Sequence, residues 1–244
     1  MFSECTLLTT APELPATTLQ SSCYSSMFQG CTALTRVPEL PATTLAQYCY
    51  SNMFNGCTAL TKVPELPATT LAQYCYSNMF NGCTNLIHAQ IELPATVLES
   101  NCYREMFKNC TSLIDTPQLP ALNLNTSCYY DMFSGCTSLI QPSILPATAL
   151  SISCYHSMFS GCTSLTTAPE LPAVNLSSGS YENMFSGCTS LNYIKMLASN
   201  IPAGSLRDWV NGVASTGTFV KAADATIPSG SSGIPDGWTV EDAT

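Results

Sequence analysis

The hydrophobic positions of the chain follow a short pattern that recurs many times. Its first part, seen at Leu60, Val63 and Leu66, is a brief apolar run that contains threonines and is closed by prolines. Such a run is typical of a short strand, and Pro64 and Pro67 limit its ladder because they lack an N–H donor. We therefore expect a strand of a few residues in each unit.

The second part of the pattern has a different spacing. Cys75, Met79 and Cys83 lie four residues apart, and Tyr76 and Phe80 share that interval. Positions i, i+4 and i+8 lie on one side of an α-helix, so this spacing predicts a short helix with a broad apolar face. A glycine ends the segment in most copies, and an asparagine ends it in the fifth. Both residues tolerate the left-handed conformation of a helix cap.

The whole unit repeats about every 26 residues. Residues 31–56 and 57–82 are identical except that Arg36 becomes Lys62. The dipeptide Met-Phe marks the eight copies, at Met1, Met27, Met53, Met79, Met106, Met132, Met158 and Met184. One such unit cannot cover its own apolar side chains, so neighbouring units must stack. The sequence predicts an α/β repeat solenoid of eight turns over residues 1–197, the first turn incomplete. Because strands pack more closely than helices, we expect an arc with strands on its concave face and helices on its convex face.

The repeat disappears in residues 198–244, which we interpret as a C-terminal capping segment. Residues 205–212 suggest a short helix, and residues 217–221 and 238–240 alternate like two strands. Trp209, Phe219 and Trp238 would plug the last turn. An independent binding module is disfavoured, because about 45 residues without disulfides rarely fold alone. The first Met-Phe falls inside a unit, so we expect either that the chain is a piece of a longer array or that this edge docks on a partner. We hypothesise that the isolated chain self-associates through this uncapped N-terminal turn.

Composition narrows the classes of function. The chain is 45% hydrophobic and only 9% charged, and its net charge of −9 reflects 7 Lys and Arg against 16 Asp and Glu. No basic stripe is available for nucleic acid, and an acidic surface disfavours anionic membranes. No apolar run approaches the length of a membrane span, and the first residues of the sequence do not show the basic segment and apolar run that a signal peptide would have.

The 14 cysteines all belong to the repeat, eight after the glycine position and six before a tyrosine or its equivalent. An even count raises the possibility of a disulfide framework. Cysteines eight residues apart on a helix are about 12 Å apart, which is too far for a bridge. We favour buried free thiols that pack as small hydrophobic groups. Zinc is disfavoured, because there is no Cys-x-x-Cys pair and only His88 and His156 could assist. We expect no cofactor and no metal.

The run Met-Phe-x-Gly-Cys-Thr-Ser-Leu-Thr followed by Leu-Pro, as at residues 158–166, resembles the leucine-rich repeats of BspA-like bacterial surface proteins. The resemblance covers roughly residues 1–197, although this version has a longer period and an added Cys-Tyr pair. It implies an extracellular or cell-surface location, a role in adhesion to proteins, and no catalytic residues.

Comparison of the repeats with one another identifies a candidate binding surface. Two residues after the first strand leucine, the eight turns carry seven residue types between nearly constant neighbours. These residues are Thr10, Arg36, Lys62, His88, Asp115, Gln141, Thr167 and Tyr193. A varying column on a constant scaffold is typical of a recognition surface, although exposed positions also drift without function. On the expected arc the column would face the concave side.

A second column contains glutamates. It holds Glu13, Glu39, Glu65, Glu92 and Glu170, interrupted by Gln118 and Ile144. Stacked carboxylates repel one another, so they must be hydrated, paired or shared by a cation, and hydration is the simpler interpretation.

The residues do not favour catalysis. His156 is next to Ser157 and near Cys154, but this adjacency is only sequential and has no third partner. No Gly-rich loop could cradle a phosphate. We expect a non-enzymatic, surface-displayed module that binds a protein or a glycan. The alternative is a structural spacer, or a subunit of a surface, fibre or virion assembly.

Overall fold

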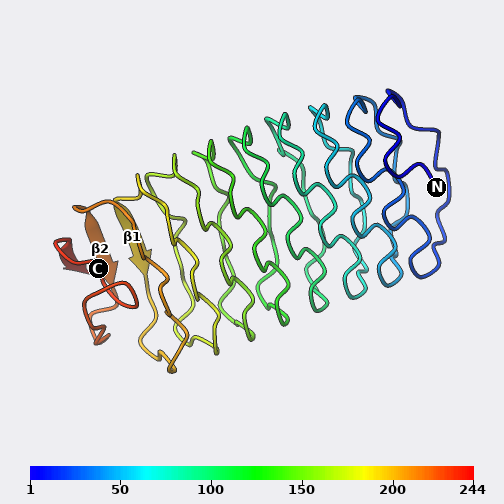
Figure 1. The fold of residues 1–244 in the computed structure, drawn as a ribbon. Helices are drawn as coiled ribbons and strands as arrows, with labels where there is room; N and C mark the ends of the chain where they lie inside the picture. The colour runs from blue at the N-terminus through cyan, green and yellow to red at the C-terminus, as the bar shows by residue number, and fades with distance from the viewer.

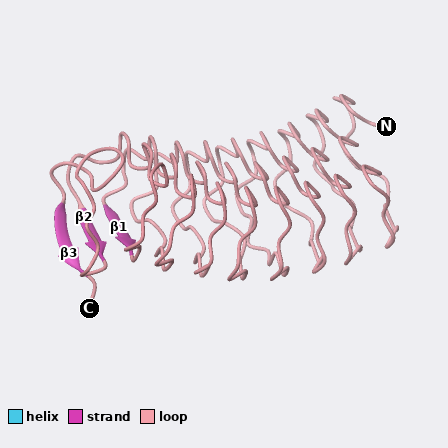
Figure 2. Ribbon diagram, turned by 90° about the horizontal axis from the view of Figure 1, so that it is seen from below, coloured by secondary structure: helices cyan, strands magenta, loops and turns pink.

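The computed structural model describes all 244 residues and contains no helix (Figures 1 and 2). Its three strands are β1 (Tyr193–Met196), β2 (Thr218–Lys221) and β3 (Thr239–Asp242). They form one parallel sheet in the order β1-β2-β3. The predicted α/β architecture with helices on one face is therefore wrong, although the stacking of repeat turns is plain in Figure 1.

The strand part of each earlier turn is reduced to isolated bridges between neighbouring turns. Thr10 pairs with Arg36, Asp115 with Gln141 and Thr167 with Tyr193, always in parallel register. The prolines that follow within a few residues have no N–H to extend the ladder, which explains why only the eighth turn, without those prolines, forms the regular strand β1.

The segment predicted to be a helix is a series of overlapping β-turns, which we call the turn ribbon (residues 72–83 and their equivalents). Alternate N–H groups bond three residues back, as Met79 N does to Tyr76 O at 3.2 Å. The others donate to the next turn of the stack, as Phe80 N does to Met106 O at 2.8 Å. A helix would satisfy all these groups internally but would hold its neighbours about 8–10 Å apart. The ribbon keeps adjacent turns at nearly strand spacing, so the ribbon of every turn donates hydrogen bonds to the ribbon of the next.

Every fourth residue of the turn ribbon has a positive φ, as at Tyr74 (58°), Asn78 (56°) and Gly82 (73°). A positive φ at the third position of a β-turn is characteristic of type II turns. The four-residue interval that suggested a helical face is therefore the period of the turns. Asn109, which replaces the glycine of other copies, has a φ of 59° and so keeps the left-handed backbone predicted for that position.

The core consists of aromatic columns that run the length of the stack. Phe2, Phe28, Phe54, Phe80, Phe107, Phe133, Phe159 and Phe185 stack with ring centroids 5.4–5.7 Å apart. A tyrosine column from Tyr24 to Tyr181 runs beside it at 5.6–6.0 Å. This spacing is close to that of strands and well below the roughly 8–10 Å of packed helices, so the mismatch expected between a strand face and a helix face is absent.

The cysteine side chains line the same interior. All 14 are free thiols, and only Cys5 and Cys23 are exposed, so buried packing is confirmed for the other twelve. The thiols that follow the glycine position donate to the phenylalanine carbonyl of the preceding turn, at 3.0–3.3 Å. A thiol in this place serves both as a small apolar group and as a weak donor between turns.

Residues 205–212 form another turn ribbon and no helix, contrary to prediction. Phe185 N donates to Trp209 O at 2.8 Å and Gly187 N donates to Asn211 O at 2.7 Å, as in the regular turns. The two predicted strands are confirmed as β2 and β3. The indole N–H groups of Trp209 and Trp238 donate to Gly233 O and Ala214 O, at 2.7 and 2.8 Å.

Candidate functional site

The varying column lies along the bridged part of the stack, which we call the strand face. Seven of its eight members are exposed, namely Thr10, Arg36, Lys62, His88, Gln141, Thr167 and Tyr193. The ladder continues past the recognisable repeats, because Tyr193 pairs with Thr218 and Thr218 pairs with Thr239. Sequence comparison missed these last two positions, since their turns are shorter and share no motif with the others.

Asp115 differs from the rest of the column because it is 4% exposed. Its carboxylate accepts from Ala89 N at 2.8 Å and from Gln90 Nε2 at 2.9 Å, and lies 2.6 Å from His88 Nδ1. These partners belong to the one turn that carries an inserted residue. Asp115 therefore anchors the enlarged loop, and its side chain is not available to a partner as the rest of the column is.

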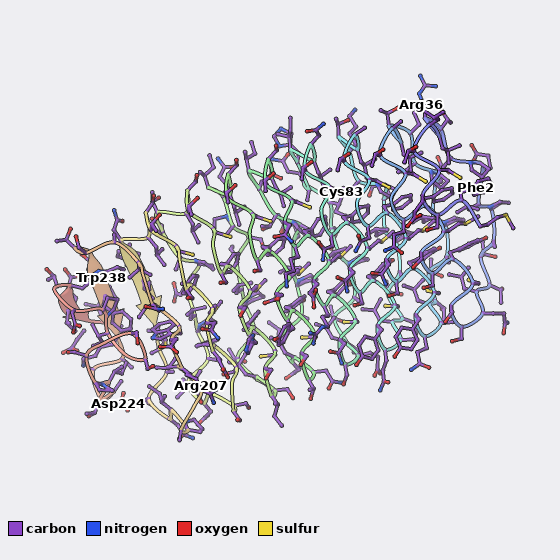
Figure 3. All side chains as sticks on the ribbon, in the orientation of Figure 1. Phe2, Arg36, Cys83, Arg207, Asp224 and Trp238 are labelled. Carbon is purple, nitrogen blue, oxygen red and sulfur yellow. The ribbon has the colours of Figure 1, made fainter.

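Arg36 and Lys62 are the free cations of the protein. The other five basic side chains each have a carboxylate oxygen within 3.1 Å. Arg36 and Lys62 have no carboxylate within 4.0 Å, and they occupy adjacent turns of one column. Figure 3 shows Arg36 pointing away from the stack, whereas Cys83 lies within it.

An aliphatic stripe lies beside the column in the middle turns. The residue before the varying one is a threonine in four of the eight turns and an asparagine in the eighth, but an isoleucine at Ile87, Ile114 and Ile140. Ile87 is 44% exposed and Ile140 is 52% exposed. Ile114 N donates to Ile87 O at 3.0 Å, and Ile140 N donates to Ile114 O at 3.2 Å, so the three are stacked in register. The stripe borders a shallow hollow lined also by Asn85, Ser112 and Ser138.

The glutamate column lies on the other side of the varying column. All five of its glutamates are exposed, and Glu170 pairs with Lys195 at 3.1 Å. No group of three or more His, Cys, Asp or Glu side chains comes together as a metal would require. The geometry is that of solvated surface carboxylates.

A network of charged and aromatic side chains crosses the turn ribbons of the C-terminal half, and sequence analysis missed it. The Arg104 guanidinium lies 4.0 Å from the Tyr130 ring centroid, and Tyr130 stacks on His156 at 4.3 Å. His156 Nε2 lies 3.8 Å from Glu182 Oε1, which Arg207 Nη1 contacts at 3.0 Å. The available signal was the residue after each Cys-Tyr pair, which is Ser in three turns and then varies.

The charges of this network are satisfied within it. Lys108 Nζ donates to Asp131 Oδ2 at 2.5 Å, and although burial acts to lower it, this hydrogen bond and charge raise the pKa of Lys108. Burial lowers the pKa of His156, an effect that the Glu182 carboxylate partly offsets. Such closed pairing connects successive turns and presents little unsatisfied charge to a partner.

His156 and Ser157 do come together, with Ser157 Oγ 2.9 Å from His156 Nδ1. Ser157 is 8% exposed, however, and none of the main surface hollows is lined by either residue. A nucleophile needs an open position where a reacting atom can sit, and none of these hollows provides one beside the pair.

The structure also contains no helix with the length and apolar character required to cross a bilayer. What it presents is a long, regular backbone with exposed, varying side chains along one face. These features define a repeat protein of the leucine-rich class.

The family model for the BspA-type leucine-rich repeat region matches residues 1–140 and 103–205, in six copies. The chain belongs to this family, as the repeat motif indicated. Proteins of the family are typically surface-associated in bacteria, and their repeats are generally non-enzymatic scaffolds for protein interaction. Comparison with curated proteins and with solved structures gives no match.

Proposed function

We propose that this chain is a non-enzymatic binding module that holds a protein or glycan partner on its strand face, displayed at a cell surface. One observation carries the proposal. The exposed side chains of the varying column change from turn to turn, while the bridges that form between its members (Thr10–Arg36, Asp115–Gln141 and Thr167–Tyr193) all keep the same parallel register. Varying side chains on a rigid support suit specific recognition, because ordering them on binding costs little additional entropy.

The test replaces Arg36, Lys62 and His88 with alanine together. Asp115 is left unchanged, because removing its carboxylate would leave Ala89 N and Gln90 Nε2 without their buried acceptor. Pull-downs from host and bacterial surface extracts, together with a glycan array, measure binding by the wild type and the variant. We expect the variant to lose its ligand while its melting temperature stays within a few degrees of the wild-type value.

A matched control alters exposed side chains away from the strand face. Gln47→Ala and Gln73→Ala change the beginning of the turn ribbon in the same two turns as Arg36 and Lys62, where the hydrogen bonds of these two glutamines are made by their backbone carbonyls. This control should bind as the wild type does. Equal binding by the strand-face variant and the wild type would reject the site. End-to-end assembly without any captured partner would favour a structural role instead.

A further inference from the structure

We infer that the strand face from the second to the sixth turn is a two-part docking surface for an extended protein segment with acidic residues beside aliphatic ones. The inference rests on the proposed function and specifies the chemistry of the partner. Its two parts are the cations Arg36 and Lys62, and the aliphatic stripe of Ile87, Ile114 and Ile140.

The basic part consists of the two cations that have no carboxylate partner within the chain. In a chain of net charge −9, every other lysine and arginine is neutralised by a carboxylate of the chain itself. Two adjacent unpaired cations on one face are complementary to a pair of carboxylates on a partner. Because screening limits exposed charges to about 10 Å at 0.1 M salt, this attraction is local and persists despite the negative net charge.

The glutamate column determines the side from which those carboxylates approach. Glu39 and Glu65 follow Arg36 and Lys62 by three residues in the same strand segments, and both are exposed. A partner carboxylate on that side would meet like charge. On the opposite side lie Thr35 and Thr61, which are neutral and share their column with the aliphatic stripe.

The aliphatic part favours a protein over a glycan. Ile87 and Ile140 expose about half of their surface where other turns carry threonine. Isoleucine offers no hydrogen bond to a hydroxyl-rich ligand and no aromatic face for a sugar ring. It can instead be buried against Val, Ile or Leu side chains, which is the characteristic contribution of the centre of a protein interface.

The dimensions suit a short extended segment. Arg36 and Ile140 are four turns apart, or about 19 Å at strand spacing. An extended chain advances about 3.3 Å per residue, so roughly six residues running along the stack would reach both parts. The partner segment therefore places its carboxylates at one end and its aliphatic side chains at the other.

The test uses an array of immobilised ten-residue peptides probed with the intact chain. The peptides combine Asp and Glu with Ile and Val, and the comparison sets replace the acids with Lys or the aliphatic residues with Ser. A glycan array is probed in parallel. We expect retention of acidic–aliphatic peptides only, with binding that weakens at least several-fold between low and moderate salt.

Two double variants dissect the surface. Arg36→Gln with Lys62→Gln should lower affinity at least tenfold and abolish the salt dependence. Ile87→Thr with Ile140→Thr should lower affinity at least tenfold and leave the salt dependence intact. The second variant introduces the residue that other turns carry at this position, so the fold is expected to persist.

The matched control is Gln47→Glu with Gln73→Glu, which makes the same change in net charge in the same turns but off the strand face. It should bind as the wild type does. The inference is overturned if comparison peptides bind equally well, if either double variant keeps full affinity, or if the control loses as much. A glycan that requires the varying column would overturn the inference and leave the proposed function standing. Absence of any ligand that depends on the column would overturn both.

Discussion

The phenylalanine column provides the sharpest test of how this stack is held together. Phe80 is fully buried between Phe54 and Phe107, with centroid distances of 5.6 and 5.4 Å. Phe80→Ala should therefore destabilise the chain by about 3–5 kcal/mol, the usual loss for a buried phenylalanine. Phe80→Leu keeps most of the apolar volume but removes two ring pairs, for about 1–3 kcal/mol.

Phe2 is the internal control, because it belongs to the same column but has a stacked ring on one side only. It is partly exposed and stacks only on Phe28, at 5.6 Å. Phe2→Ala should cost about 1–2 kcal/mol, since less surface is lost from the core and only one ring pair is broken. The difference between the two sites isolates the contribution of stacking on both sides.

Urea unfolding measures the three variants by circular dichroism and by tryptophan fluorescence. Trp238 lies at the C-terminal end of the stack (Figure 3), and Trp209 packs between Phe185 and Phe219 of the same end, so the two indoles report that end alone. Because turns contact only their neighbours, the dichroism midpoint of Phe80→Ala should fall more than the tryptophan midpoint. Equal costs at Phe80 and Phe2 would refute a core built from stacked rings. Identical shifts of both probes would refute nearest-neighbour coupling.

Two further predictions concern the turn ribbon and the thiols. Gly82 has a φ of 73°, and a Cβ there would meet Gly56 only at 3.8 Å, so Gly82→Ala should cost about 1–2 kcal/mol through backbone conformation alone. A calorimetric melting temperature equal to that of the wild type would contradict the left-handed assignment. Burial raises the pKa of Cys136 from 9.0 to about 12, so above pH 9 the unfolded chain releases a proton that the folded chain keeps. Stability should be constant below about pH 8 and fall by about 1.4 kcal/mol per pH unit for each such thiol above pH 9; urea midpoints that do not change up to pH 11 would exclude this linkage.

The register of the surface columns could be predicted from the sequence with little error. Self-similarity aligns each turn with the next, and residues equivalent in the repeat lie beside one another in the structure. Thr10 and Arg36, for example, were expected to be neighbours and form a parallel bridge. What the alignment could not show is whether a member of the column is free. The side chain of Gln141 is exposed, whereas that of Asp115 is buried, because the inserted residue brings Ala89 and Gln90 to its carboxylate. Only the folded structure shows this difference.

The secondary structure of the second half of each unit could not be predicted in this way. A four-residue interval fits both an α-helix and a series of β-turns, and hydrophobic spacing alone does not distinguish them. The hydrogen bonds between turns decide between the two structures, and they form only when several units are stacked. The polar residue at every fourth position, such as Asn52 or Asn78, was the overlooked signal, since asparagine enters the left-handed region more readily than most residues.

The C-terminal segment covers the end of the stack with its backbone as well as with its side chains. Trp209, Phe219 and Trp238 were expected to cover the last turn as a hydrophobic plug, and they are buried there. The backbone of this segment nevertheless continues the stack, because β2 and β3 pair in the register of β1 after intervals of 25 and 21 residues. A parallel edge leaves N–H and C=O groups unpaired, and apolar side chains alone cannot satisfy them. Covering such an edge therefore requires further rungs of the same ladder, whose side chains can diverge from the repeat because only their backbone must match it.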